Sequence, residues 1–222
     1  MKSLHLAAAF AGAVAALLVI ARKLGGSPGS GIGPSAPGSS YVPPGFVPTI
    51  ASLPDVPGLA KMPPEFLVGM ARLVANLGWT QEHADVIAAL MSHESGFRAD
   101  AVNQYGGATG LIQFMPATAK SVGTTVEALR GMTALEQLPF VEAYFRPVKK
   151  LAPRDIPMMG LGKGVGQGDD VVAFEAGQKG YDWNKALDLN KDGKLTLGEV
   201  RRDVLKVLDG RGRIPVPGAP LA

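Results

Sequence analysis

The chain has 222 residues, no cysteine and a formal net charge of +3. The absence of cysteine excludes disulfides, zinc–thiolate sites and a cysteine nucleophile. The net positive charge lies in residues 1–62, where four basic side chains accompany a single acidic one, so residues 63–222 carry 18 basic and 18 acidic side chains. A nucleic-acid partner is therefore not expected, because a protein that binds nucleic acid needs an excess of basic residues in its folded part.

Residues 1–24 contain an apolar segment. Residues 4–21 carry no charged side chain, which meets the minimum length of a transmembrane helix and is long for the core of a signal peptide. Lys2 precedes this segment, Arg22 and Lys23 follow it, and no clear small-x-small cleavage site stands nearby. We expect a hydrophobic N-terminal helix that anchors the protein in a membrane, with a cleaved signal and a buried or packaging helix as alternatives. The positive-inside rule would keep the Arg22 side cytoplasmic, and the orientation stays open.

Residues 25–63 are dominated by Gly, Pro, Ser and Ala. Such a segment buries too little apolar area to offset the entropy of ordering it, so we expect a disordered, partly extended linker. Short apolar pieces around Phe46 and Ile50 could still dock onto a folded domain. At the other end of the chain, residues 210–222 are expected to be a flexible tail.

Helical periodicity begins with the predicted domain, residues 64–209. Apolar residues recur at spacings of three and four over 66–77, which predicts a first helix. Thr80 is a suitable N-cap for a second helix, whose apolar stripe includes Ile87 and Met91.

Further helices follow along the chain. Pro116 suits the first turn of a third helix, and the capping-box pattern from Thr133 to Glu136 opens a fourth, which we expect to bend or break at Pro139. The glycine-rich run 160–168 lacks the Lys-Ser/Thr ending of a phosphate-binding loop and is expected to be a flexible connector. Because alternating strand patterns are scarce, the fold class is mainly α.

Glu94 lies one helical turn beyond Leu90 and Met91, on the inward face of the second helix. Burial disfavours the charged form of a carboxylate and raises its pKa, which suits an acid catalyst. Ser95 and Gly96 then end the helix, which would place Glu94 at the lip of a cleft. His93 points off the apolar stripe and is expected to be exposed. Taken alone, a glutamate at a helix end is more often a solvated or capping residue than a catalyst.

The residues around Glu94 make the pattern more specific. The runs are Glu94-Ser-Gly-Phe-Arg-Ala-Asp-Ala-Val-Asn103 and Gly107-Ala-Thr-Gly-Leu-Ile-Gln-Phe-Met-Pro-Ala-Thr-Ala119. They closely resemble the soluble lytic transglycosylase family, whose hallmarks are Glu-Ser at a helix end followed by Gly-Leu-x-Gln-x-Met-Pro. The sequence that follows, as far as Tyr144-Phe145, is most similar to virion-associated members from bacteriophages. The resemblance spans residues 64 to 208 and implies a lysozyme-like helical domain of the transglycosylase type.

The resemblance also implies roles for single residues. Glu94 would be the single acid and base of the reaction, Ser95 would hydrogen-bond the substrate or Glu94, and Gln113 would bind a sugar. A transglycosylase needs one carboxylic acid, whereas most lysozymes use a second carboxylate. Asp100 is the nearest acidic residue for that second role, although an exposed turn is its expected place.

The family's Ala-Tyr-Asn-Ala-Gly motif departs from its usual form here. In family members its tyrosine contacts the catalytic acid, but the best match in this chain is Ala173-Phe-Glu-Ala-Gly177, in which Phe174 has no hydroxyl group. Either Tyr144 or Tyr181 takes that role, or the matched segment is not the equivalent one. Tyr144 and Phe174 are therefore both candidate substrate-binding residues.

Residues 188–199 follow the pattern of an EF-hand calcium loop. Gly193 allows the sharp turn that such a loop needs, and Glu199 stands where the final, bidentate ligand is required. The predicted ligands are Asp188, Asn190, Asp192, Lys194 through its carbonyl group, Thr196 and Glu199. The alternative is a polar turn without an ion. Because a single loop is present, a structural Ca²⁺ that fixes a C-terminal helix at 197–208 is favoured over a sensor.

The sequence thus favours a lytic transglycosylase that cuts the MurNAc–GlcNAc β-1,4 bond of peptidoglycan and leaves 1,6-anhydromuramoyl ends. Its expected partners are peptidoglycan glycan strands, a membrane through the N-terminal helix, and other proteins of a virion or a secretion machine. It would be membrane-anchored or virion-associated and act in the bacterial periplasm or cell wall, as at phage genome entry. The alternatives are a hydrolytic muramidase and a non-catalytic structural protein that binds calcium and peptidoglycan.

Overall fold

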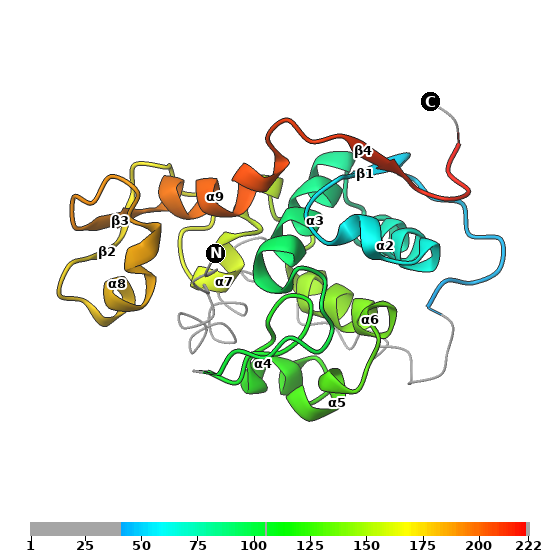
Figure 1. Ribbon diagram of the computed structural model, residues 1–222, viewed down its shortest axis with the longest axis horizontal. Coiled ribbons are helices and arrows are strands. Elements are labelled where there is room, and N and C mark those ends of the chain that lie inside the picture. The colour runs from blue at the N-terminus through cyan, green and yellow to red at the C-terminus, as the bar shows by residue number, and fades with distance from the viewer. Residues whose placement is uncertain (1–40, 105, 221–222) are drawn as a thin grey trace.

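The computed structural model describes residues 41–104 and 106–220, which are mainly helical (Figure 1). The predicted N-terminal helix and the first part of the predicted linker lie outside these residues. Within the described ranges no helix is both long and apolar enough to cross a membrane. The α-helices are α2 (Pro64–Leu77), α3 (Gln81–Ser95), α4 (Pro116–Ser121), α5 (Val126–Arg130), α6 (Ala134–Phe145), α7 (Met158–Leu161), α8 (Lys179–Asn184) and α9 (Leu197–Leu205).

Short elements connect these helices. The strands are β1 (Ser52–Pro54), β2 (Val172–Glu175), β3 (Lys194–Thr196) and β4 (Arg213–Pro215). The 3-10 turns are η2 (Leu59–Lys61), η3 (Arg146–Val148), η4 (Pro153–Asp155), η5 (Lys185–Leu187) and η6 (Lys206–Leu208). The mainly-α prediction is confirmed.

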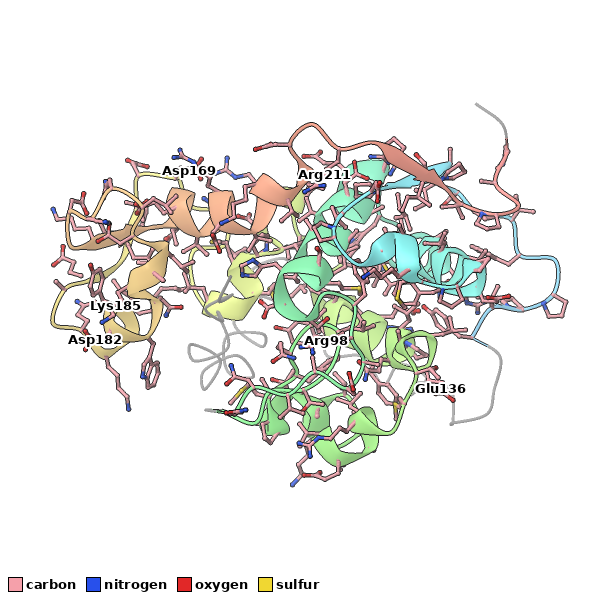
Figure 2. All side chains as sticks on the ribbon, in the orientation of Figure 1. Arg98, Glu136, Asp169, Asp182, Lys185 and Arg211 are labelled. Atoms are coloured by element: carbon pink, nitrogen blue, oxygen red, sulfur yellow. The ribbon has the colours of Figure 1, made fainter. Side chains whose placement is uncertain are left out.

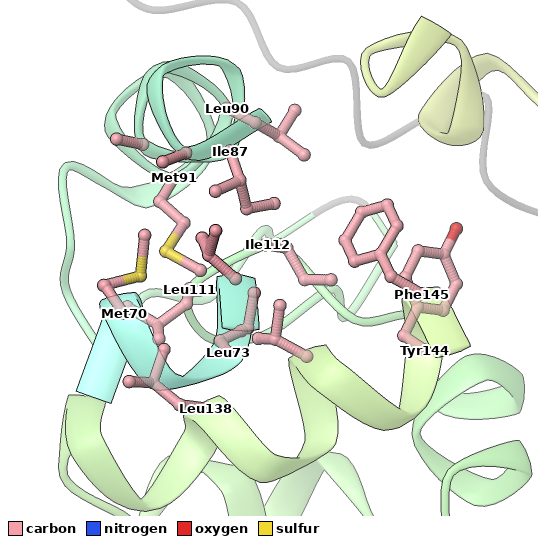
Figure 3. Packing of buried hydrophobic residues seen from close by; sticks show 14 of the residues in the cluster. Met70, Leu73, Ile87, Leu90, Met91, Leu111, Ile112, Leu138, Tyr144 and Phe145 are labelled. Carbon is pink, nitrogen blue, oxygen red and sulfur yellow. The ribbon is translucent and has the colours of Figure 1, made fainter. Parts of the chain in front are cut away.

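Helices α2, α3 and α6 build the main core. Their apolar stripes meet at residues that are fully or almost fully buried, because each helix repeats large side chains at spacings of three and four. Figure 3 shows this packing with Met70 and Leu73 from α2, Ile87, Leu90 and Met91 from α3, and Leu138 from α6. The predicted capping box is present, since the Thr133 N–H donates to Glu136 Oε2 at 2.7 Å. Helix α6 runs through Pro139 without interruption, contrary to expectation.

Residues 41–63 belong to the folded unit, which corrects the prediction of a linker up to residue 63. Leu53, Val56 and Leu59 are buried in the main core, at a spacing of three that the surrounding glycines and prolines obscure in the sequence. The Ser92 hydroxyl of α3 donates to the Pro57 carbonyl at 2.8 Å, so this segment is bonded to the helix that carries Glu94.

The predicted flexible tail is also partly structured. Strand β4 pairs antiparallel with β1, with Ile214 opposite Leu53, and Val216 is buried (Figure 1). Arg213 adds two hydrogen bonds to Ser52 at 3.0 Å and an ion pair with Asp85 at 2.8 Å. The segments before α2 and after α9 therefore close the folded unit together.

A chain that ends at Gly212 should consequently be less stable than one that ends at Pro220. The shorter chain loses the β1–β4 hydrogen bonds, the burial of Val216 and the bonds of Arg213, which together should lower the free energy of unfolding by about 2–4 kcal/mol. Urea unfolding of the two chains measures the difference. Equal stabilities would show that residues 213–220 contribute nothing to the fold.

A smaller cluster of buried residues lies beyond the main core. It comprises Met158, Leu161, Ala173, Leu187, Leu195, Leu197 and Val200. Strands β2 and β3 pair there, next to α8, at one end of the molecule, where Asp182 and Lys185 lie on the outer side (Figures 1 and 2). Helix α9 leads from this end back to the main core and packs against α3.

Arg201 of α9 fixes the glycine-rich segment that the sequence suggested was a flexible connector. Its buried guanidinium pairs with Asp155 at 2.8 Å and with Asp169, which lies beside α9 in Figure 2. The same guanidinium donates to the carbonyl groups of Gly164 and Gln167. The segment is therefore tied to α9 by a buried charge with several partners.

Candidate active site

Glu94 occupies the last turn of α3, which ends at Ser95 and is capped by Gly96 in the left-handed conformation with φ 61°. Its inward position is as predicted, because it continues the stripe of Leu90 and Met91. The side chain is more deeply placed than the lip of a cleft, with only 4% of its surface exposed. Helix α3 therefore carries a carboxylic acid into an apolar interior.

The electrostatic surroundings of Glu94 favour its neutral form. Burial in the first place, and the negative charge of Asp203 in the second, raise the pKa of Glu94 from 4.5 to about 8. Neither carboxyl oxygen has a hydrogen-bond partner among the described residues. At neutral pH the group is thus mostly protonated, and its proton is not donated to any other group in the described part of the chain.

Tyr144 of α6 is the aromatic residue that the structure brings to Glu94. Its hydroxyl is buried and has no hydrogen-bond partner among the described residues. Burial first, and the Glu94 carboxylate second, raise the pKa of Tyr144. The ring packs edge-on against Phe114 and, as Figure 3 shows, against Phe145, and these contacts hold it in place.

The two other aromatic candidates lie elsewhere. The Tyr181 hydroxyl donates to Asp188 Oδ2 at 2.7 Å, in the predicted calcium loop. Phe174 lies in β2, where its ring packs against the smaller cluster and the Lys163 ammonium sits 4.2 Å from the ring centroid. The structure thus brings Tyr144 to Glu94 and does not bring Phe174 there.

Ser95 and Gln113 hold the loop that follows α3. The Ser95 hydroxyl lies within hydrogen-bond distance of the carbonyls of Met91, at 3.2 Å, and Leu111, at 3.0 Å. The Gln113 amide donates to the carbonyls of Ala101 and Gly110, and this side chain is 2% exposed. The recorded bonds of both residues therefore lie inside the protein, where the resemblance had implied contacts with a sugar.

Gln137 of α6 is a site residue that sequence reasoning missed. Its Oε1 accepts from the Leu111 N–H at 2.9 Å, while its Nε2 donates to the Ala99 and Leu129 carbonyls at 2.8 Å each. A Cβ added at Gly110, which has φ 82°, would stand 2.4 Å from Gln137 Oε1. Position 110 of the Gly-Leu-x-Gln motif therefore requires glycine, because a side chain there would collide with the buried amide of Gln137.

The acidic residue near Glu94 is Asp203 of α9, whereas Asp100 lies in an exposed turn, as anticipated. His93 corrects a further expectation. Its side chain is 12% exposed, and its Nε2 lies 3.6 Å from Asp203 Oδ2. The packing of α9 over α3 covers this histidine, and the sequence of α3 alone contains no sign of that contact.

The predicted calcium loop is closed by hydrogen bonds to its own acidic side chains. Asp188 accepts from the N–H groups of Asp192 and Gly193 at 3.3 and 3.0 Å. Glu199 accepts from the Leu189 N–H at 3.0 Å and from the Thr196 N–H at 2.9 Å, and it forms a capping box with Thr196 at the start of α9. Gly193 has φ 82°, so the turn uses the glycine as predicted.

Within the described ranges, no three His, Asp or Glu side chains are gathered as ligands of a metal ion would be. The two oxygens of Glu199 instead accept from backbone N–H groups. The donor chemistry of the loop nevertheless suits Ca²⁺, because it combines three carboxylates with an amide, a hydroxyl and a carbonyl oxygen over twelve residues.

Residues 78–137 match the family model described as Transglycosylase SLT domain. The matched segment contains Glu94, Ser95, Gln113 and the start of α6 with Gln137, and it ends before Tyr144 and the loop at 188–199. No curated protein and no solved structure matches the chain. The match supports the lysozyme-like superfamily and lytic transglycosylase activity on peptidoglycan in general.

Proposed function

We propose that this protein is a peptidoglycan lytic transglycosylase with Glu94 as its acid and base. The observation that carries the proposal is the burial of Glu94 at the end of α3, without a hydrogen-bond partner among the described residues and with a pKa of about 8. An acid that is still protonated at neutral pH can give its proton to a glycosidic oxygen. The match of residues 78–137 to the transglycosylase SLT domain supports peptidoglycan as the substrate.

The proposed reaction uses one carboxyl group twice. Glu94 protonates the oxygen that leaves C1 of the MurNAc residue, and the bond between C1 and that oxygen breaks. The C6 hydroxyl of the same sugar then attacks C1 while the Glu94 carboxylate accepts the hydroxyl proton. The products are a free GlcNAc 4-hydroxyl and a 1,6-anhydromuramoyl end, and the acid returns to its starting form.

Tyr144 would orient Glu94 in this reaction, because its hydroxyl is buried near that acid and has no hydrogen-bond partner within residues 41–104 and 106–220. Tyr144→Phe should therefore reduce the rate of glycan cleavage by about 10- to 100-fold. The free energy of unfolding should change by less than about 1 kcal/mol, since no hydrogen bond of the folded protein is lost.

Tyr41→Phe is the matched control. The Tyr41 hydroxyl donates to the buried Glu142, away from Glu94, so its removal should lower stability and leave the cleavage rate per folded molecule unchanged. Rates on purified peptidoglycan and urea unfolding of both variants separate the two effects. An unchanged rate for Tyr144→Phe would remove Tyr144 from the site.

The loop 188–199 would bind a structural Ca²⁺ through Asp188, Asn190, Asp192, Lys194, Thr196 and Glu199. The ion would supply two positive charges that offset most of the negative charge of the three carboxylates, and the chemistry of cleavage would not involve it. The hydrogen bonds that close the loop around Asp188 support this proposal, because they fold the backbone of residues 188–193 into the tight turn with which such a loop begins.

We also propose that residues 4–21 anchor the protein in a membrane or a virion and that the enzyme acts in the periplasm or cell wall at phage genome entry. The uncharged length of this segment and the resemblance to virion-associated members support the idea. Virion or secretion-machine proteins would then be its neighbours. Sedimentation of the full chain with lipid vesicles tests the anchor, and a chain without residues 1–24 that sediments equally well would contradict it.

The decisive experiment for the activity is mass spectrometry of the products released from purified peptidoglycan by the full chain with Ca²⁺. Anhydromuramoyl ends that disappear with Glu94→Gln would support a transglycosylase with Glu94 as its acid. Reducing ends would show a hydrolytic muramidase instead. Binding to peptidoglycan without any release of fragments would favour the structural alternative.

A further inference from the structure

Asp203 is the second acidic side chain near Glu94, and it comes from a distant part of the chain. It lies on α9, which packs against α3 (Figure 1). Its side chain is mostly buried, and it directly precedes Val204, which belongs to the main core. Its Oδ2 lies 3.6 Å from Nε2 of His93, the residue that precedes Glu94.

Two nitrogen-containing side chains contact the Asp203 carboxylate. His93 approaches Oδ2 from α3, and the Lys206 ammonium pairs with Oδ1 from the next turn of the chain. The Lys206 side chain is more than half exposed, whereas the Asp203 side chain is mostly buried. The negative charge of this ion pair therefore lies inside the protein, and the positive charge lies at its surface. Solvent screens the lysine charge more strongly than the buried carboxylate.

The groups that face Glu94 come from three elements. Tyr144 of α6 is neutral at ordinary pH, His93 belongs to α3 itself, and Asp203 contributes from α9 with Lys206 behind it. Burial is the main cause that keeps Glu94 protonated, and the negative charge of Asp203 is the second. A like charge has a large effect in a buried, poorly screened site.

We propose that Asp203 is a positioning residue of the site, a fixed negative charge held by His93 and Lys206 that acts on Glu94 across the α3–α9 interface. The inference rests on the proposed function for its catalytic meaning, while the electrostatic contact does not depend on it. Asp203 does not touch the substrate in this scheme. It sets the pH range in which Glu94 carries the proton that it donates.

The test compares Asp203→Asn with Asp209→Asn in the full chain. Asp209 is an exposed residue at the end of η6, so its replacement makes the same change of charge away from Glu94. For Asp203→Asn, the basic limb of the pH–rate profile should move to lower pH. The rate at pH 8 relative to that at pH 5.5 should fall about two- to fivefold, while Asp209→Asn keeps the profile of the parent. A loss by the same factor at every pH would mean a merely structural role and would overturn the proposal.

A second readout does not need activity. The ¹³C carboxyl resonance of Glu94, assigned by its absence in Glu94→Gln, should titrate at lower pH in Asp203→Asn than in the parent chain. If the parent chain proves inactive, this shift still supports the electrostatic contact, and the proposed function alone has failed. An unchanged titration in a folded Asp203→Asn variant refutes the contact.

Lys206→Gln removes a positive charge at an exposed position, whereas Asp203→Asn removes a negative charge, so the two variants should shift the pKa of Glu94 in opposite directions. Removal of the ammonium leaves the Asp203 charge less compensated, so the Glu94 resonance should titrate at higher pH. If Asp203→Asn does not fold, as judged by its circular dichroism, this variant decides the matter. A shift to higher pH supports the proposal, and no shift overturns it.

Discussion

Glu94→Gln is expected to abolish the release of glycan fragments, with a loss of at least about 10³-fold, while it stabilises the fold at alkaline pH. The activity is lost because an amide cannot donate a proton to the leaving oxygen. The stability gain arises because the parent chain must keep a buried acid whose pKa is raised from 4.5 to about 8. Mass spectrometry of soluble products measures the first effect.

The sign of the stability effect follows from the raised pKa. Below pH 4.5 Glu94 is protonated in both the folded and the unfolded chain, so it contributes no pH dependence. Between pH 4.5 and about 8 the unfolded chain ionises and the folded chain does not, so the fold loses stability as the pH rises. Above about pH 8 the penalty is complete, on the order of several kcal/mol.

Urea unfolding of the parent chain and Glu94→Gln at pH 4.5 and pH 8 measures this penalty. The stability of the variant relative to the parent should increase by about 2–4 kcal/mol between the two pH values. Glu94→Gln buries an amide that has no hydrogen-bond partner, which lowers the stability of the variant. This loss is the same at both pH values, so it cancels when the two stability differences are compared. Glu82→Gln, an exposed change in the first turn of the same helix, should show no comparable increase. If the stability of Glu94→Gln relative to the parent were the same at both pH values, Glu94 would ionise as readily in the folded protein as in the unfolded chain.

Addition of Ca²⁺ is expected to raise the melting temperature of the parent chain by roughly 5–10 °C at a concentration about 100 times the dissociation constant. An ion that binds the folded loop and not the unfolded chain stabilises the fold by mass action. The six predicted ligands include Glu199, whose replacement by glutamine removes the bidentate final ligand. Glu199→Gln should therefore melt at the same temperature with Ca²⁺ or with a chelator.

Glu175→Gln is the matched control for this experiment, because Glu175 is exposed on β2, opposite Lys194 of the loop strand. Its melting temperature should still respond to Ca²⁺. Calorimetric titration with Ca²⁺ should show one site in the parent chain and none in Glu199→Gln. Absence of heat and of any thermal shift in the parent would establish residues 188–199 as a polar turn that closes without an ion.

The elements nearest Glu94 could be predicted because their signals are local. The stripe in α3 placed Glu94 on the inward face, and the capping box at Thr133 marked the start of α6. Periodicity and capping depend on residues within a few positions of one another, so the sequence shows them directly. The helix expected at 197–208 after the predicted calcium loop is observed as α9 and η6.

The rest of the site depends on contacts between distant segments. Asp203 reaches the neighbourhood of Glu94 only because α9 packs on α3, and Gln137 binds the loop after α3 from a helix 26 residues away from Leu111. The core residues Leu53 and Val56 looked like part of a spacer, since their burial depends on strand β4 and on α3. No local pattern carries that information.

The pairing of β1 with β4 has a mechanical consequence. Both ends of the folded unit are fastened to each other, so neither end can be peeled away without breaking the same short ladder. A pull on the residues that precede Tyr41 would first load the hydrogen bond from its hydroxyl to Glu142, which ties it to α6. Only then would the force reach the β1–β4 ladder, so a chain held by its N-terminal segment would bear tension at α6 before α3, the helix that carries Glu94, is strained.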